Sequence, residues 1–231
     1  SGRWTRVDSR RDRAAARLVS NSSATHFEFV VNRERNTYTE QALARISESY
    51  LNQNDYQNAQ RYLQRLETEA NSPQNIIFAQ TNMMKASYEL KEYAKTVTYA
   101  EKVLANDRID DNIRSDAQVF IARSALKTND DAKAKAAYAK VKQIARGHLA
   151  AEALYYEAYF KNKESDFGGS NASIQKLAKD YSGYKLFGAK GLVLMAKNFY
   201  ALKDAFQATY ILENVIENFK EYPEVVEEAK S

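Results

Sequence analysis

The sequence contains no cysteine, only seven glycines and two prolines among its 231 residues, and no long uninterrupted apolar run. The absence of cysteine excludes disulfides, cysteine-based zinc sites and a thiol nucleophile. Few glycines and prolines leave too few turn signals for a protein built from many short strands. No stretch approaches the roughly 18 apolar residues of a membrane-spanning helix. The sequence therefore predicts an all-α chain without a transmembrane segment.

Patterns of catalytic and metal-binding residues are absent as well. His26 and His148 lie far apart, and each suits a surface or capping role better than catalysis. The sequence contains no His-Glu-x-x-His, no Gly-x-Ser-x-Gly and no spaced set of metal ligands. The stretch FGGSN, residues 167–171, indicates a loop that leads into a helix capped near Ser170 or Asn171. We expect no enzymatic activity, no cofactor and no bound metal.

The net charge of +4 is concentrated at one end of the chain. Residues 1–17 contain six Arg and two Asp and account for the whole of it, so residues 18–231 are neutral. Residues 206–231 contain six Glu and two Lys, a net charge of −4. Opposite charges at the two ends permit head-to-tail contact between copies, and hence a homo-oligomer through the terminal repeats.

One spacing of apolar and small residues recurs along the chain. It is clearest in Leu43-x-x-Ile46-Ser47-x-x-Tyr50, followed by a polar break and Tyr56-x-x-Ala59-x-x-x-Leu63. The residues that follow each polar break in the five copies are numbered 56, 93, 131, 167 and 205, which are 36 to 38 residues apart. A fixed period of this length indicates a helical repeat array.

This spacing resembles that of the tetratricopeptide repeat (TPR) family, in which small residues face each other on the two helices of a repeat. The paired positions here are Ser47/Ala59, Ala122/Ala134, Ala158/Ser170 and Ala196/Ala208. The resemblance implies an all-α, TPR-like α-solenoid of about five helix-turn-helix repeats that form a right-handed superhelix. It covers residues 39–223, divided at 39–73, 74–110, 111–147, 148–184 and 185–223, and 224–231 begins a further helix.

Some positions depart from the family pattern. Met84 and Thr96 stand where small residues are expected, and Glu157 and Lys161 stand where apolar residues should be, four apart and able to pair along a helix. Residues 1–38 lack the repeat. There, 25–36 includes a short β-prone run and 10–19 suits one helix. For this leader, a partial repeat, a docking helix, disorder and a non-native origin all stay open.

The family's groove positions fall on the first helix of each repeat. Carried onto this sequence, the candidate partner-groove residues are Arg45, Glu48, Leu51, Asn52, Phe78, Thr81, Lys85, Tyr88, Val119, Arg123, Lys127, Tyr155, Tyr159, Lys163, Val193, Lys197 and Tyr200. We hypothesise that an acidic or carboxylate-terminated segment binds there, with charge from Lys85, Arg123 and Lys197 and apolar contact from Tyr155 and Tyr159.

The resemblance implies a non-catalytic scaffold that binds a peptide or helix of a partner protein in a concave groove. The helix endings QKLAKDYSGY and ENVIENFKEYP are similar to those of TPR proteins of the bacterial envelope, which implies a periplasmic or outer-membrane-associated protein within a larger assembly. The alternatives are a carbohydrate-binding or regulatory module of the envelope, or a nucleic-acid-linked regulator that uses the Arg-rich leader. The neutral body argues against nucleic acid.

Overall fold

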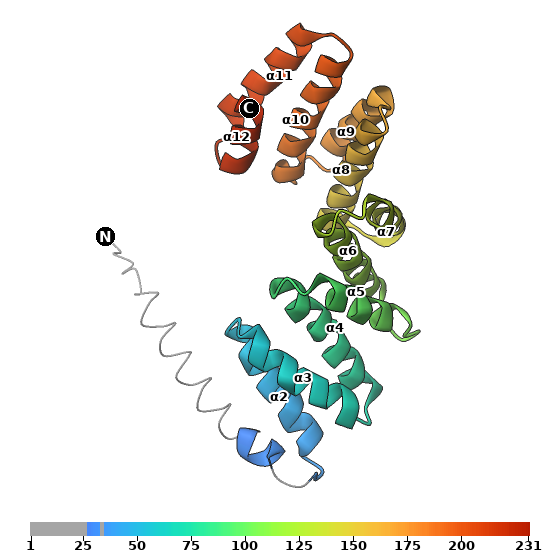
Figure 1. Ribbon diagram of the computed structural model, residues 1–231, viewed down its shortest axis with the longest axis vertical. Coiled ribbons are helices and arrows are strands. Elements are labelled where there is room, and N and C mark those ends of the chain that lie inside the picture. Colours follow the sequence, from blue (N-terminus) through green and yellow to red (C-terminus); the bar gives the residue numbers. More distant parts are fainter. Residues whose placement is uncertain (1–26, 33–34) are drawn as a thin grey trace, which may run out of the picture. The chain divides into compact units, whose positions relative to one another are not determined.

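Short turns separate helices throughout the part of the chain that the structure describes. The computed structural model describes residues 27–32 and 35–231, and every regular element in these ranges is helical (Figure 1). Residues 27–31 form a short helical segment. The longer helices are α2 (Thr39–Asn52), α3 (Tyr56–Glu69), α4 (Pro73–Glu89), α5 (Tyr93–Leu104), α6 (Asp111–Lys127), α7 (Asp131–Ile144), α8 (Gly147–Lys163), α9 (Phe167–Asp180), α10 (Lys185–Ala201), α11 (Ala205–Asn218) and α12 (Pro223–Lys230).

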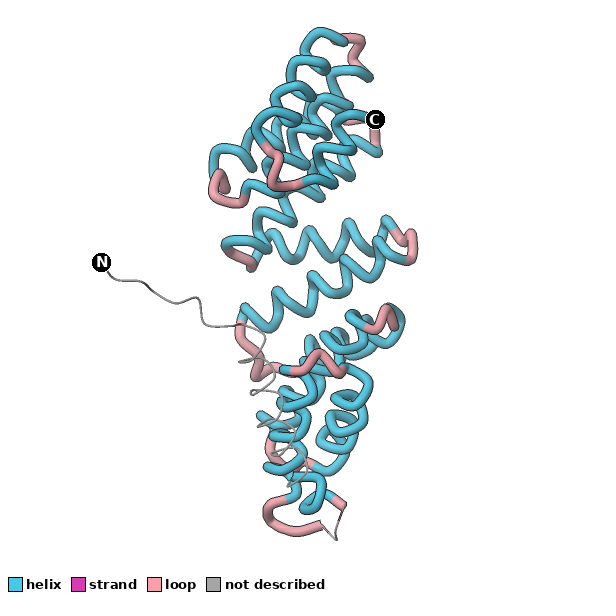
Figure 2. The backbone as a smooth tube through the Cα atoms, turned by 90° about the vertical axis from the view of Figure 1, so that its left-hand side faces the viewer, coloured by secondary structure: helices cyan, strands magenta, loops and turns pink. Residues whose placement is uncertain are grey.

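The chain divides into two compact units, one ending at Ile109 and one spanning Asp110–Ser231. In the first unit, α2 pairs with α3 and α4 with α5, and α4 also packs on α2 and α3. In the second unit the pairs are α6/α7, α8/α9 and α10/α11, with α12 packed on α10 and α11. Figure 2 shows these pairs as helical hairpins joined by short loops. The predicted all-α fold of helix-turn-helix repeats is thereby confirmed.

A three-residue turn joins the two helices of every pair. Its middle residue has a positive φ, between 57° and 67°, at each of Asn54, Lys91, Asn129, Ser165 and Lys203. Its third residue is acidic and is the N-cap of the second helix, which therefore begins at residue 56, 93, 131, 167 or 205. Four of these N-caps, Asp55, Asp130, Asp166 and Asp204, accept a hydrogen bond from a backbone N–H of the first turn. The carboxylate also faces the positive end of the helix dipole.

The cap of α9 lies earlier than the sequence suggested. Asp166 Oδ1 accepts the N–H of Gly169 at 2.9 Å, so Gly168, Gly169 and Ser170 are already helical. The expectation of a cap at Ser170 or Asn171 is wrong because the aspartate of the preceding turn satisfies the first N–H groups.

The predicted small-residue pairs are buried where the two helices of a repeat touch. Ser47 and Ala59 are both fully buried, and so are Ala122 and Ala134. In the α8/α9 pair the contact is direct, because the Ser170 hydroxyl donates to the backbone oxygen of Ala158 at 2.9 Å. The departing pair, Met84 and Thr96, is also fully buried. The Thr96 hydroxyl donates to the backbone oxygen of Glu92, so the larger side chains of this pair leave no polar atom of their own unpaired.

The segment 27–32 packs on the first repeat as a helix, and the β-prone run predicted within 25–36 is wrong for 27–31. Glu28 Oε1 accepts hydrogen bonds from the hydroxyls of Tyr50 and Tyr62, at 2.9 and 3.0 Å. The two tyrosine rings are stacked, with their centres 5.6 Å apart. Burial, followed by the Glu28 hydrogen bond, raises the pKa of Tyr50 to about 12. The remainder of the leader, including the predicted helix at 10–19, lies outside the described residues.

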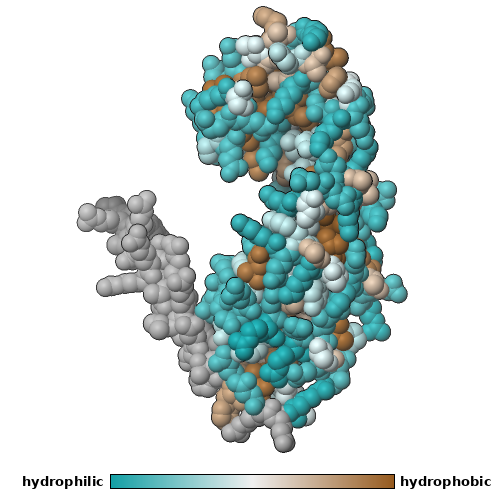
Figure 3. All heavy atoms as spheres, viewed as in Figure 1, coloured by the Kyte–Doolittle hydropathy of each residue, from teal (hydrophilic) through white to brown (hydrophobic). Residues whose placement is uncertain are grey.

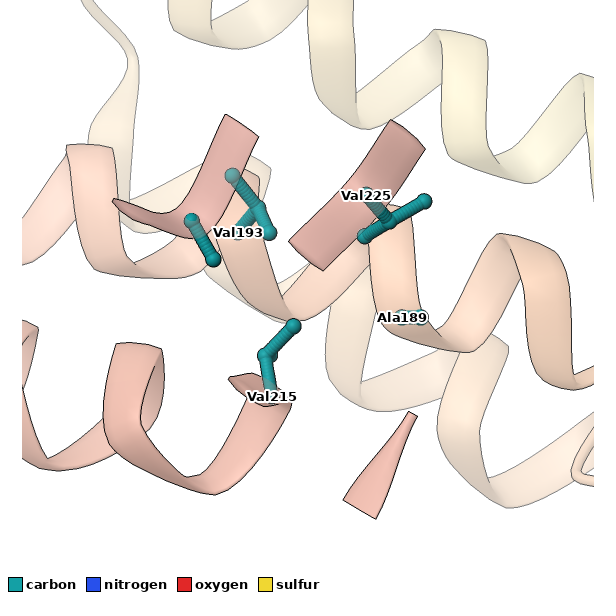
Figure 4. Packing of buried hydrophobic residues seen from close by; sticks show 5 residues of the cluster. Ala189, Val193, Val215 and Val225 are labelled. Carbon is teal, nitrogen blue, oxygen red and sulfur yellow. The ribbon is translucent and has the colours of Figure 1, made fainter. Parts of the chain in front are cut away.

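The core of the last repeat is closed by α12. Ala189, Val193, Val215, Val225 and Ala229 form one buried cluster that joins α10, α11 and α12 (Figure 4). Pro223 is the first residue of α12 and Pro73 that of α4, where the missing N–H of proline leaves no helical hydrogen bond unmade.

A test of the turn uses Lys203, whose φ is +67°. A β-branched side chain is strained in this region and glycine is not, so we expect Lys203→Val to be less stable than Lys203→Gly by about 1–2 kcal/mol. Urea unfolding of the two variants measures the difference. Equal stabilities would contradict the assigned turn conformation.

Candidate functional site

The candidate residues of the first unit lie on α2 and α4. On α2, Arg45 and Glu48 form an exposed ion pair at 3.1 Å, and Asn52 is exposed. On α4, Lys85 and Tyr88 are half-buried, and the Tyr88 ring meets the Tyr93 ring edge-on at 5.8 Å. The helices α2 and α4 pack together, so these candidate residues lie on neighbouring first helices of one unit.

Three of the seventeen candidates are not on a surface. Val119 and Val193 are 1% exposed, and Thr81 is 8% exposed. Val193 belongs to the cluster that joins α10 to α12 (Figure 4). Their assignment to the groove is wrong, because side chains at these positions face packed neighbours rather than solvent.

Arg123 takes part in an internal network of the second unit. Its guanidinium, on α6, donates through Nε and Nη2 to both carboxylate oxygens of Glu152 on α8, at 2.7 and 2.5 Å. The hydroxyl of Tyr138, on α7, donates to the same carboxylate at 2.9 Å. Glu152 is 3% exposed, so this network ties three helices together around a buried charge. The charge of Arg123 is therefore already paired within the fold.

Aromatic stacking extends this network. The rings of Tyr138 and Tyr156 stack at 4.3 Å, and Tyr156 lies beside Tyr155 and Tyr159 on α8. Burial, then the charge of Glu152, raises the pKa of both Tyr138 and Tyr156. Sequence reasoning missed Glu152 because no other repeat has a glutamate at this register. Tyr156 could have been noticed in the run LYYEAYF at 154–160.

Three first helices of the second unit are neighbours, because α10 packs on both α8 and α12. On α10, Lys197 pairs with Glu228 of α12 at 2.6 Å. On α8, Tyr155 lies 6.1 Å from the Phe187 ring of α10, and its pKa is raised by burial and by the nearby charges, Glu228 among them. The structure thus places the predicted residues Tyr155 and Lys197 on adjacent helices, α8 and α10.

Further candidates flank this region. The Lys163 ammonium lies 5.4 Å from the centre of the Tyr159 ring and pairs with Asp131, whereas Tyr200 is 71% exposed. Lys127, at the end of α6, is exposed. We name Tyr155, Tyr159, Lys163, Lys197 and Tyr200 the first-helix face of the second unit.

A cleft of about 560 Å³ separates α7 from α8. Its walls include Tyr138, Ala139, Ala153 and Phe160, and three lysines and three carboxylates line it as well. Ion pairs cross from one helix to the other, Lys142 with Glu157 and Lys135 with Glu164.

Glu157 also pairs with Lys161 at 2.9 Å, as their spacing predicted. Burial raises the pKa of Glu157, but hydrogen bonds from Lys142 and Lys161 outweigh it and leave this pKa below its ordinary value. The cleft is thus held by charge pairs that are complete within the protein.

No group of three or more His, Asp or Glu side chains within the described ranges is placed to hold a metal ion. His148 lies edge-on to Phe187 at 5.0 Å, and His26 is outside the described residues. None of the helices described is long and apolar enough to cross a membrane.

A test of the buried network uses Arg123. Removing its guanidinium in Arg123→Ala leaves a buried carboxylate without its cation, which we expect to destabilise the protein by about 3 kcal/mol. The double variant Arg123→Met/Glu152→Met should recover most of the loss, since it removes both charges. Arg45→Ala, at an exposed pair, should change stability by about 0.5 kcal/mol or less. Urea unfolding gives the three values, and an Arg123→Ala effect no larger than that of Arg45→Ala would refute the network.

No protein-family model matches the sequence, and no curated protein matches it. Solved structures do resemble the chain. YrrB, described as a TPR protein with an unusual peptide-binding site, has a TM-score of 0.65 at 11% identity and covers 90% of this chain and 100% of its own. PilF of Pseudomonas aeruginosa has a TM-score of 0.61 at 15% identity, with coverages of 95% and 98%.

A tetratricopeptide repeat protein from Parabacteroides merdae has a TM-score of 0.55 at 12% identity, with coverages of 92% and 93%. At these identities the similarity concerns the fold alone. The chain therefore has the fold of the tetratricopeptide repeat proteins, as the spacing of its small residues predicted.

Proposed function

We propose that this protein is a non-catalytic scaffold that binds an extended segment or helix of a partner protein on the first-helix face of its second unit. The observation that carries the proposal is the exposed ion pair of Lys197 on α10 with Glu228 on α12, together with the packing of α10 on α8, which carries Tyr155. One chain segment lying across these helices would contact all of them. The fold shared with YrrB, whose description includes a peptide-binding site, supports a binding role.

The chemistry of this face favours a partner segment with both carboxylate and apolar side chains. Tyr200 and Tyr159 offer ring surface, and tyrosine is enriched at binding hot spots. Lys197 and Glu228 are 55% and 47% exposed, and an ion pair so exposed contributes little to stability. A partner carboxylate can therefore take the place of Glu228 at small cost.

Arg123 is excluded from this role, because its guanidinium is engaged by the buried Glu152. Lys85 belongs to the first unit, as do Arg45, Glu48, Asn52 and Tyr88. The proposal for the second unit therefore rests on Lys197 and the tyrosines rather than on the three cations of the sequence-based hypothesis.

A periplasmic or outer-membrane-associated location within a larger assembly is part of the proposal. It is supported by the helix endings at 175–184 and 213–223, which are similar to those of TPR proteins of the bacterial envelope.

The proposal is tested by selecting binding peptides from a random display library on the immobilised full chain. Fluorescence anisotropy then gives the dissociation constants of the selected peptides for the unmodified protein and for the variant Lys197→Ala/Tyr200→Ala. We expect the selection to yield acidic peptides that also contain apolar residues. The variant should bind them about tenfold or more weakly than the unmodified protein does.

The matched control is Lys220→Ala/Tyr38→Ala, which removes the same exposed residue types elsewhere. It should bind as the unmodified protein does. Selected peptides that ignore Lys197 and Tyr200 would overturn the assignment of this face.

A further inference from the structure

Large exposed hydrophobic side chains gather in one short part of the second unit. Six such side chains occur among the described residues, and four of them lie between positions 200 and 210. Two belong to α11, where Phe206 is 79% exposed and Tyr210 is 62% exposed. Figure 3 shows the prevailing pattern on one face of the protein, in which hydrophobic residues appear as patches among hydrophilic ones. Phe206 and Tyr210 thus place two exposed aromatic rings one helical turn apart on α11.

The equivalent positions of the other second helices show that repeat stacking does not explain these rings. The second and sixth residues of α3, α5, α7 and α9 correspond to Phe206 and Tyr210. They are all exposed, and they are Gln57/Arg61, Ala94/Thr98, Ala132/Ala136 and Gly168/Ala172. Since α3, α5, α7 and α9 are each followed by another repeat and still expose these positions, a following repeat does not cover them. Only α11 places aromatic side chains there.

The same face of α11 continues with two carboxylates. Phe206, Tyr210, Glu213 and Glu217 are spaced i, i+4, i+7 and i+11, which places them in one row about 16 Å long. Glu213 and Glu217 are exposed, and neither pairs with another residue of the described part of the chain. We name these four residues the α11 stripe.

The position of Glu217 does not serve the stability of the helix. It lies in the last turn of α11, where the helix dipole disfavours negative charge, and this turn contains no basic residue. A carboxylate at this place, like an exposed phenylalanine, is a local disadvantage in the isolated protein. Both features become favourable once a complementary surface covers them.

We propose that the α11 stripe is a second docking surface, and that it binds a basic amphipathic helix of a partner protein. Apolar side chains of that helix pack on Phe206 and Tyr210, and Lys or Arg on the same side reaches Glu213 and Glu217. The carboxylates select against an anionic membrane and against nucleic acid, both of which they repel. They also disfavour a second copy of α11, because the stripe supplies no cation to offset two further carboxylates.

This surface is independent of the first-helix face. The stripe lies on a second helix, prefers basic rather than acidic partners, and shares no residue with the other face. One chain could hold two partner segments of opposite charge at the same time.

The test uses two synthetic helical peptides and the full chain. One peptide carries Leu and Lys in a row matching the stripe, and the other has Glu in place of each Lys. Fluorescence anisotropy measures their binding to the unmodified protein, to Phe206→Ala/Tyr210→Ala and to Glu213→Gln/Glu217→Gln. The matched control, Glu224→Gln/Glu227→Gln, removes the same charge from exposed positions of α12.

We expect the Lys peptide to bind saturably and the Glu peptide not to bind. Phe206→Ala/Tyr210→Ala should weaken binding of the Lys peptide about tenfold or more. Glu213→Gln/Glu217→Gln should abolish both the preference for Lys and the salt dependence. The control and Lys197→Ala/Tyr200→Ala should leave this binding unchanged. Because all four stripe residues are exposed, helicity and Tm should not fall in any variant.

Three results would overturn the proposal. The first is equal binding of the Lys and Glu peptides, and the second is binding that survives the loss of both rings. The third is concentration-dependent self-association, seen by sedimentation, that is lost with Phe206 and Tyr210, because it would make a second copy the occupant. If Lys197→Ala/Tyr200→Ala fails to weaken binding of the acidic peptides, the proposed function is wrong, but the proposal for the α11 stripe is unaffected.

Discussion

The close approach of two helices at a pair of small residues is the contact on which the rest of the structure depends. Two buried alanines in one cluster, as in Ala196/Ala208, let the helix axes approach and bring neighbouring larger side chains into contact. The turn fixes the geometry of this approach, since a residue with positive φ reverses the chain and an acidic residue starts the next helix. Each pair buries too little surface to be stable alone, and therefore packs on the next pair.

The helix pairs could be predicted from the sequence, because the residues that define each pair are close together in the chain. Ser47 and Ala59 lie on consecutive helices joined by a single interhelical turn. Residues that follow the polar breaks of the sequence, such as Tyr56 and Ala205, are the first residues of second helices. The left-handed turn residues were harder to foresee, since Asn, Lys and Ser occupy a position that glycine would have marked. In the leader, local composition predicted the wrong structure. Residues 27–31 are β-prone but form a helix, whose Glu28 accepts hydrogen bonds from Tyr50 and Tyr62 of the first repeat.

The Glu157–Lys161 pair within one helix was predicted from its spacing, but ion pairs between helices were not, because their partners are far apart in the sequence. Arg123 and Glu152 are 29 residues apart, and nothing in either repeat marks the other as its partner. Carrying groove positions over by register therefore placed a structural arginine among binding residues. Register also identified Lys197 and Tyr200, which remain exposed, and failed for Val193, which α12 covers. Comparison of equivalent positions among the repeats singled out α11, the only second helix with aromatic side chains at its exposed second and sixth residues, and this difference is the basis of the proposed second docking surface.

The most direct measurement of the central claim compares two alanines on α7. Ala134 is fully buried at a small-residue pair, whereas Ala136 is exposed two residues later on the same helix. The free energy of urea unfolding of Ala134→Leu should fall by about 1–3 kcal/mol, because the added side chain forces α6 and α7 apart. That of Ala136→Leu should change by about 0.5 kcal/mol or less. Equal effects of the two substitutions would contradict the role assigned to close helix approach.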